Sequence, residues 1–304
     1  MLKRKSSLNS KIGLKIRNNV DAWILMLPMV LALYLFVWRP TIMGGYWSFF
    51  NMRGFTPGNF VGFDNYIKVL THTQFLPMLW NTIQYVLWSI IIGFLPPIVI
   101  AIMLNELIHF RNGMRVLIYL PAIIPGIAGM LIWYFIYYPD QTGLLNLLLG
   151  KFDIEPYIWL NDADFTILGL VIYSTWKGMP GTMLLYFACV QGVSVEQYEA
   201  AIIDGAGPFK RAWYVTRPAL DGIIILTLVR TIIGVFQILE LPLTMTGGGP
   251  NGASATLSYQ LYQYGFNSGG RGTGQAMALG VIIFLILIVF TCFYFVINRK
   301  IEDR

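Results

Sequence analysis

Six apolar segments, each long enough to cross a bilayer, constrain the fold of this chain more than any other feature. They run over residues 22–50, 78–104, 114–138, 165–192, 219–243 and 276–297. A spanning helix needs about 20 mostly apolar residues, because its backbone polar groups must be bonded within the segment. Only 12% of the 304 residues are charged, against about 25% in soluble domains. The sequence therefore predicts an all-α polytopic membrane protein, a six-span helical bundle.

The basic residues predict how these spans are oriented. Residues 1–20 contain six basic residues and no acid, which favours a cytoplasmic N-terminal arm. Six spans then place both termini in the cytoplasm, and 14 of the 21 Lys and Arg residues fall in the segments on that side. The predicted domains are this arm (1–20), a transmembrane domain (21–298) and a short cytoplasmic tail (299–304).

The arm has two other readings. The apolar run after it has no small-residue cleavage pattern, so we expect an uncleaved first span rather than a signal peptide. A basic arm can also bind nucleic acid, but orientation alone accounts for these charges. We predict membrane lipid and no nucleic acid as its surroundings.

The longest polar interruption on the cytoplasmic side, residues 194–218, has clear helix signals. Ser194 followed by Gln197 is typical of a capping box, which predicts a helix from Val195. Asp204-Gly205 ends that helix, because Gly accepts a positive φ at a helix C-terminus. Gly207-Pro208 predicts a second short helix, which Arg217-Pro218 closes. Two short helices joined by a tight turn suit an element that docks on another protein.

This loop resembles the EAA loop of the permease subunits of binding-protein-dependent ABC sugar importers, the maltose/glycerol-phosphate type. The residues that carry the resemblance are Glu199, Ala200, Ala201, Asp204, Gly205, Ala206 and Pro218. Two positions depart from the family pattern: its usual Phe falls at Ala212, with Trp213 one place later, and its second Pro is Asp221. In that family the loop is a coupling helix that sits in a cleft of the cytoplasmic ATPase, so the resemblance implies that residues 199–206 couple this chain to partner ATPases.

Two outer segments extend the resemblance. Val61-Gly62-Phe63-Asp64-Asn65-Tyr66 is similar to the V-G-x-x-N-Y signature of sugar-type permeases, and Thr246-Gly247-Gly248-Gly249-Pro250 is similar to a run after their fifth span. Residues 139–164 are acidic, and we expect a short interfacial helix there. The matches extend over about residues 60 to 304.

The resemblance also implies a fold, a location and partners. The fold is the type I ABC importer permease bundle, in a bacterial cytoplasmic (inner) membrane. The partners are a second homologous permease in a heterodimer, with a homodimer left open, two ATPases, an extracellular or periplasmic solute-binding protein and a carbohydrate. No Walker A pattern occurs in the chain. We therefore expect a non-catalytic subunit without a cofactor of its own, whose partner ATPases bind ATP and Mg.

Polar side chains inside the spans are candidates for the solute pathway, because a charge at bilayer depth costs about 2.5–3.5 kcal/mol on insertion scales. Lys177 lies near mid-depth of the fourth span, where a structural and a cavity-facing role fit equally. Arg230 either meets an acidic or heavily hydroxylated solute, pairs with an acid of the partner permease, or points towards the water-filled centre. Gln237 lies two turns after Arg230, which predicts a shared helix face. The full candidate set is Tyr173, Trp176, Lys177, Arg230, Gln237 and Glu240.

Prolines predict kinks in two spans. Gly93, Pro96 and Pro97 should bend the second span, and Pro121 and Pro125 the third. Kinked helices favour a bundle that can rock between inward- and outward-facing states.

Two other functional classes compete with the importer hypothesis. An ATP-independent secondary carrier would transport without an ATPase, and a polytopic sugar-transfer enzyme would need convergent acids or histidines. The acids are scattered over outer loops, and His72 and His109 are isolated in sequence. Cys189 and Cys292 lie inside apolar runs, which predicts small buried hydrophobes and neither a disulfide nor a metal site.

Overall fold

Six membrane-crossing segments form the framework of the computed structural model, which describes residues 20–106 and 111–302. Four are single helices long and apolar enough to span a bilayer: Ala22–Trp47, Phe75–Glu106, Pro208–Phe236 and Thr273–Phe295. The third span is a bent pair, Gly113–Ile123 and Gly126–Ile136, and the fourth is the helix Ala163–Gln191, followed after a 74° bend by Val195–Ile203. Together they confirm the predicted six-span bundle.

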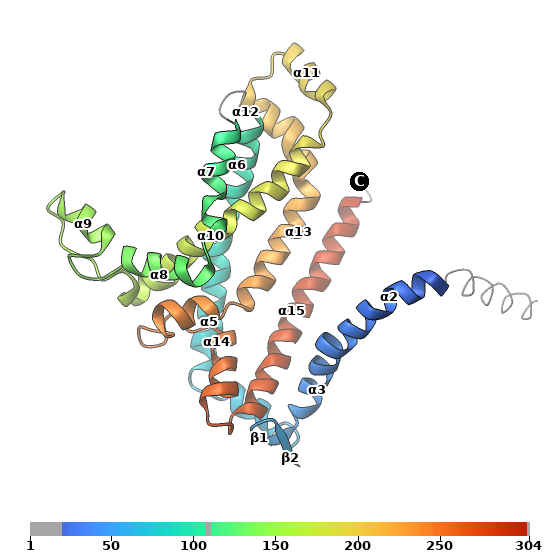
Figure 1. Ribbon diagram of the computed structural model, residues 1–304, viewed down its shortest axis with the longest axis vertical. Coiled ribbons are helices and arrows are strands. Elements are labelled where there is room, and N and C mark those ends of the chain that lie inside the picture. The colour runs from blue at the N-terminus through green and yellow to red at the C-terminus, as the bar shows by residue number, and fades with distance from the viewer. Residues whose placement is uncertain (1–19, 107–110, 303–304) are drawn as a thin grey trace, which may run out of the picture.

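The chain runs through these elements as follows (Figure 1). The first span holds α2 (Val20–Leu33), the π-helical turn η1 (Tyr34–Trp38) and α3 (Arg39–Trp47). The hairpin β1 (Phe50–Arg53) and β2 (Thr56–Phe60), then α4 (Asp64–Leu70), lead to the second span, which holds α5 (Phe75–Trp88), η2 (Ser89–Gly93) and α6 (Leu95–Glu106). The third and fourth spans hold α7 (Arg111–Ile123), α8 (Gly126–Ile136), α9 (Leu144–Gly150), η3 (Trp159–Asn161) and α10 (Ala163–Gln191). The remainder holds α11 (Val195–Ile203), α12 (Pro208–Arg211), η4 (Ala212–Thr216), α13 (Arg217–Phe236), η5 (Pro242–Thr246), α14 (Leu257–Tyr262), η6 (Gln263–Asn267) and α15 (Thr273–Glu302).

The first span ends earlier than predicted. Its helix stops at Trp47, and Phe50 begins β1 instead of ending a helix. The side chain of Asn65 explains the change, because its Nδ2 donates to the backbone oxygens of Ser48 and Phe50 at 2.8 and 2.9 Å. This buried amide lies in the V-G-x-x-N-Y run and fixes the hairpin against α4.

The predicted kinks appear at the prolines. The third span bends by 95°, and Pro125 stands at the bend as the residue before α8. In the second span, the irregular turn η2 and the bend at Phe94 directly precede Pro96 and Pro97. Both breaks agree with the missing N–H of proline.

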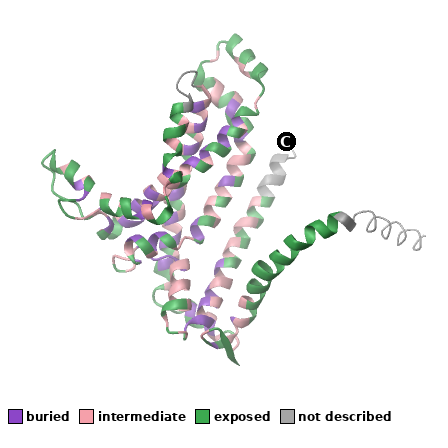
Figure 2. Cartoon of the chain, viewed as in Figure 1, coloured by how far each residue is buried: buried purple, intermediate pink, exposed green. Residues whose placement is uncertain are grey.

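The described core divides into three clusters of buried side chains. One packs α6, α10 and the start of α13 around Tyr186 and Leu220. A second packs α8, α10 and the end of α13 around Tyr173, and a third packs α5, α14 and α15 around Leu279. The first span contributes to none of them. None of its apolar window is buried by the described chain, and α2 is exposed from Ala22 to Leu33 (Figure 2).

The outer segment 139–164 contains the expected short helix, α9. Its far end is fixed by Asp162, the N-cap residue of α10, whose carboxylate accepts from the backbone N–H of Asp164 at 2.9 Å. The hydroxyl of Tyr157 also donates to this carboxylate. These hydrogen bonds, the tyrosine's first, lower the pKa of Asp162 below its ordinary value.

Candidate functional site

The polar loop (residues 194–218) folds as two short helices with a glycine turn between them. α11 begins at Val195 as predicted and ends at Ile203. Gly205 has a φ of +75°, which favours glycine. The amide of Ala206 donates to the oxygen of Ala201 at 2.8 Å, and that of Gly205 to Ile202 at 2.9 Å. This pair of bonds is the Schellman arrangement that closes a helix at a glycine.

Two predictions about this loop are wrong. The Ser194 side chain makes no cap hydrogen bond, so there is no capping box. Because Ser194 is exposed, water can satisfy both its hydroxyl and the free amides of the first turn. Pro218 does not close the second helix either, since the helix continues from Pro208 to Phe236. The π-helical turn η4 precedes this proline, and its wider hydrogen-bond spacing accommodates a residue without an N–H.

The EAA residues from Glu199 to Ala206 lie together at one end of the bundle, where α11 projects beyond the spans (Figure 1), and Pro218 lies in the first turn of α13. Five of the seven are exposed, while Ala201 and Ala206 are half-buried. Apolar side chains share this exposure: Ile203 is 85% exposed and Phe209 92% exposed. A tip that exposes large apolar groups beside carboxylates fits a surface that another protein covers.

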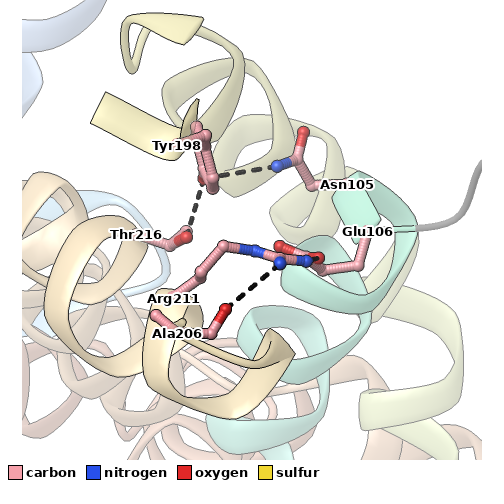
Figure 3. A network of polar contacts seen from close by, with 6 residues as sticks. All are labelled: Asn105, Glu106, Tyr198, Ala206, Arg211 and Thr216. Carbon is pink, nitrogen blue, oxygen red and sulfur yellow. Dashed lines mark hydrogen bonds and ion pairs between the residues drawn. The ribbon is translucent and has the colours of Figure 1, made fainter. Parts of the chain in front are cut away.

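Figure 3 shows a polar network beneath this tip that the sequence did not predict. Arg211 forms an ion pair with Glu106 at the end of α6 and donates to the oxygen of Ala206 at 3.4 Å. The hydroxyl of Tyr198 bonds to the Thr216 hydroxyl at 2.7 Å. In the sequence, Arg211 counted only as a cytoplasmic charge. The available signal was Glu106, the one acid between the second and third predicted spans.

Lys177 lies against the break in the third span. Its Nζ donates to the backbone oxygens of Pro121 at 2.9 Å and Ala122 at 3.3 Å, and also to Ile124. These carbonyls belong to the last turn of α7 and the break, where helical partners are missing because Pro125 has no N–H. Carbonyl groups at a helix C-terminus also carry partial negative charge, which favours an ammonium group. Of the two predicted roles for Lys177, this contact is the structural one.

Tyr173 and Trp176 belong to an aromatic cluster with Trp133, whose ring centroid lies 5.9 Å from that of Tyr173 and 5.6 Å from that of Trp176. Tyr173 is 2% exposed, and its hydroxyl donates to the oxygen of Gly126 at 3.1 Å. The structure therefore places Tyr173 in the core beside the break in the third span.

Arg230, Gln237 and Glu240 are all exposed on the described chain, but the predicted continuous fifth span is interrupted. α13 ends at Phe236, and Gln237 follows it with φ −95° and ψ 4°. The broken span remains hydrogen-bonded because hydroxyl groups from the start of α14 reach it. Ser258 donates to the oxygen of Phe236 at 2.7 Å, and Thr256 to that of Ile238 at 2.9 Å. Such side-chain donors are what a break inside a membrane requires.

A hollow of about 350 Å³ lies between the second, fourth and fifth spans. Its lining is rich in hydroxyl groups and small residues, and none of the six candidate pathway residues contributes to it. The polar and small lining residues are Ser89, Gly93, Ser174, Thr175, Gly178, Thr182, Thr231 and Gly234. Ser174 and Thr175 directly precede Trp176, and Thr231 follows Arg230, so Trp176 and Arg230 lie on helices that line the hollow but do not line it themselves.

The chain was compared with known proteins. The model of the family "Binding-protein-dependent transport system inner membrane component" matches residues 18–303. The trehalose/maltose transport system permease protein MalF of Thermococcus litoralis is 30% identical over 86% of this chain and 90% of its own length. The arabinooligosaccharides transport system permease protein AraP of Bacillus subtilis is 33% identical over 78% of this chain and 76% of its own.

Among solved structures, a chain from a bacterial ABC transporter involved in the import of the acidic polysaccharide alginate has a similar fold. It superposes with a TM-score of 0.84 at 21% identity, covering 95% of this chain and 99% of that one. The likeness at this identity shows the fold alone.

Proposed function

The chain belongs to the family of inner membrane components of binding-protein-dependent transport systems, and from that premise we propose that it is one transmembrane subunit of an ATP-driven ABC importer for a carbohydrate. One observation carries the proposal: the EAA residues from Glu199 to Ala206, most of them exposed, form a tip made of α11 and the Gly205 turn at one end of a six-span bundle. A surface of this kind needs a protein partner, and the partner that the EAA resemblance implies is an ATPase.

Two cytoplasmic ATPase subunits receive this tip in the proposed complex. Glu199 and Asp204 make polar contacts in the ATPase cleft, and the Gly205 turn sets the angle between α11 and α12. ATP and Mg bind to those subunits, and this chain takes no part in hydrolysis. The loop and the end of α15 then lie on the cytoplasmic side. Because six spans return the chain to the side where it began, both termini are cytoplasmic in this proposal.

A second homologous permease covers the first span. The exposed first span supports this assignment, since none of its apolar window is buried by the described chain. An acid of that partner subunit, or the solute, meets the exposed Arg230, which has no hydrogen bond or ion pair with the described residues.

The hydroxyl-lined hollow is the proposed place where the solute crosses. Carbohydrates are recognised by hydrogen-bonding side chains, and this lining supplies them near the centre of the bundle. The relatives support this solute class through their names, trehalose/maltose for MalF and arabinooligosaccharides for AraP. When ATP closes the ATPase dimer, the polar loop moves and the bundle changes from an inward-facing to an outward-facing state. A solute-binding protein then delivers the sugar.

The first test is purification of the tagged protein from its native membrane in mild detergent. We expect a Walker A ATPase to accompany the wild type and to be weakened in the Glu199→Ala/Asp204→Ala variant. Glu196→Ala, which removes an exposed carboxylate from the first turn of the same helix, is the matched control and should retain the ATPase. Absence of an ATPase from the wild type would refute the importer proposal.

A second arm tests the solute. Proteoliposomes that contain the purified complex and its solute-binding protein should accumulate labelled maltose, trehalose or arabinotriose. They should do so only when ATP is present on the side of the membrane that carries the ATPase subunits. Uptake without ATP would support a secondary carrier instead.

A further inference from the structure

Two adjacent residues at the end of α6 hold both helices of the polar loop (Figure 3). Asn105 donates its Nδ2–H to the Tyr198 hydroxyl of α11 at 3.3 Å, and that hydroxyl bonds to Thr216. Glu106 pairs with Arg211, the last residue of α12. The end of the second span therefore binds both helices of the loop through polar contacts.

The Glu106–Arg211 ion pair is largely protected from water. The side chains are 22% and 18% exposed. The nearby Arg217–Asp221 pair is 3.7 Å apart, and its side chains are 51% and 41% exposed. Partly buried charges are screened less by water and salt than exposed ones, and an exposed pair contributes little. The protected pair is thus the stronger of the two, and it joins the loop to α6, whereas Arg217 and Asp221 lie four residues apart on α13.

Arg211 also fixes the turn of the loop. The same guanidinium that meets Glu106 donates to the oxygen of Ala206, the residue after the Gly205 turn. One side chain therefore joins the turn, α12 and the end of α6. Arginine suits this position because its planar group presents several donors in a fixed geometry.

The middle of the second span lines the hollow. Ser89, Gly93, Phe94 and Pro97 line it from η2 and α6. The virtual Cβ of Gly93 would lie 3.1 Å from the Thr175 hydroxyl oxygen, so the second and fourth spans are in close approach there. A displacement of α6 along its axis consequently changes the lining of the hollow.

We propose that Glu106 and Arg211 are positioning residues that transmit the movement of the polar loop to the second span, and through it to the hollow. The inference rests on the proposed function, because the movement comes from the partner ATPase. A second set of hydrogen bonds makes α11 move together with α12. It joins Tyr198 to Asn105 and Thr216. Without the ion pair, the loop still docks on the ATPase but slides against α6.

The test measures the movement at the hollow without needing the solute. A reporter cysteine, Ser174→Cys, is introduced where Cys189 and Cys292 are replaced by Ala, and the complex with its co-purified ATPase is placed in lipid nanodiscs. The rate of labelling by a small maleimide is measured without nucleotide and with ATP plus vanadate. The ratio of the two rates reports how far nucleotide binding reaches the hollow.

We expect Glu106→Gln and Arg211→Gln to keep the ATPase bound yet to lower this ratio by about fivefold, the lower end of typical coupling between sites. The charge-swapped Glu106→Arg/Arg211→Glu variant should recover most of it. Asp221→Asn, the same carboxylate-to-amide change in the exposed pair, should behave as wild type. Should Glu106→Gln fail to fold, Tyr198→Phe removes the second link while keeping the ion pair, and a smaller loss is expected.

Several results would overturn the inference. A wild-type ratio in Glu106→Gln would show that the pair transmits nothing, and loss of the bound ATPase would show that it only shapes the docking surface. Failure of the charge swap to recover the ratio would show that the two residues do not act as a pair. A wild-type complex that holds an ATPase but gives no nucleotide response would leave no movement to transmit. Absence of an ATPase from the wild type would instead refute the proposed function.

Discussion

Replacing Lys177 by Met tests whether a charge inside the bundle stabilises the break in the third span. Methionine keeps an unbranched side chain of similar length and removes the ammonium group. The three backbone oxygens that accept from Nζ, those of Pro121, Ala122 and Ile124, then lose their donor. Pro125 cannot replace it, because it has no N–H.

The magnitude follows from two opposing terms. Hydrogen bonds to charged groups contribute about 1.5–3 kcal/mol each, so three contribute at least about 4.5 kcal/mol. Removing the charge recovers about 2.5–3.5 kcal/mol of insertion cost. Because Lys177 is only partly buried, we take the lower bound of the first term. The Met variant should therefore be less stable by about 1 kcal/mol or more.

The assay is thermal unfolding in mild detergent at one scan rate, followed by the fluorescence of tryptophan, two of which (Trp133 and Trp176) lie in the aromatic cluster beside the break. About 1 kcal/mol corresponds to a fall in Tm of about 2 °C or more for a chain of this length. Lys68→Met is the matched control. Lys68 pairs with Asp64 at 2.6 Å on an exposed surface, so its loss should cost less than about 1 kcal/mol.

A Lys177→Met variant as stable as the wild type, or more so, would refute this reasoning. It would mean that the insertion cost of the charge exceeds the value of its bonds. Lys177 would then have to be explained by a role in the solute pathway.

Three further predictions concern single positions. Gly205→Ala should weaken retention of the ATPase during purification, because a left-handed residue other than glycine costs about 1–2 kcal/mol. The control Gly207→Ala, at φ −68°, should retain the ATPase. Equal retention by both variants would contradict the role of the turn. Asn81→Leu should lower the Tm by an amount corresponding to about 2 kcal/mol or more, because the buried amide donates to the oxygens of Gly252 and Ala255 at 2.8 and 3.0 Å. The control is Asn267→Leu, at an exposed position. Equal Tm values for the two variants would show that the carbonyls of Gly252 and Ala255 find other donors. Because the folded pKa of Asp162 lies below its ordinary 3.8, its stabilising effect is present above about pH 4 and is lost as the pH falls through the folded pKa. The difference in Tm between the wild type and Asp162→Asn should therefore shrink between pH 6 and pH 3, and a constant difference would argue against it.

Local signals in the sequence predicted local structure well. Gly205 ends α11 and Pro125 marks the bend of the third span, because both effects depend on a few neighbouring backbone groups. The spans were predicted for the same reason, since their length and apolar character do not depend on what they contact.

Two local predictions failed, the capping box at Ser194 and the helix end at Pro218. The other failures depended on distant contacts. The sequence predicted a continuous fifth span over residues 219–243, but the helix ends at Phe236. The break is stabilised by hydroxyls of Thr256 and Ser258, which lie some twenty residues further along the chain, and no local pattern links them to it. Pro242, at the start of η5, was the one signal in the predicted span that indicated an interruption.

The hollow and the polar network were missed for a related reason. Each is assembled from several spans by small or singly charged residues, such as Ser89, Thr231 and Glu106, that look ordinary in their own segments. The EAA loop was recognisable because its residues are contiguous. Its connection to α6 crosses about a hundred residues of chain and appears only once the helices are packed.

The exposed first span has a consequence for how the molecule is made. It is synthesised before the other spans, and its packing within the chain is made mainly by α3, against α15 and β1, so α2 can meet another subunit in the membrane while the remaining spans are still being inserted. The pairing of α2 and the folding of the core thus need not follow a fixed order. A chain left without a partner would keep the apolar side chains of α2 exposed, which is a feature by which a cell's quality control can tell an orphan subunit from an assembled one.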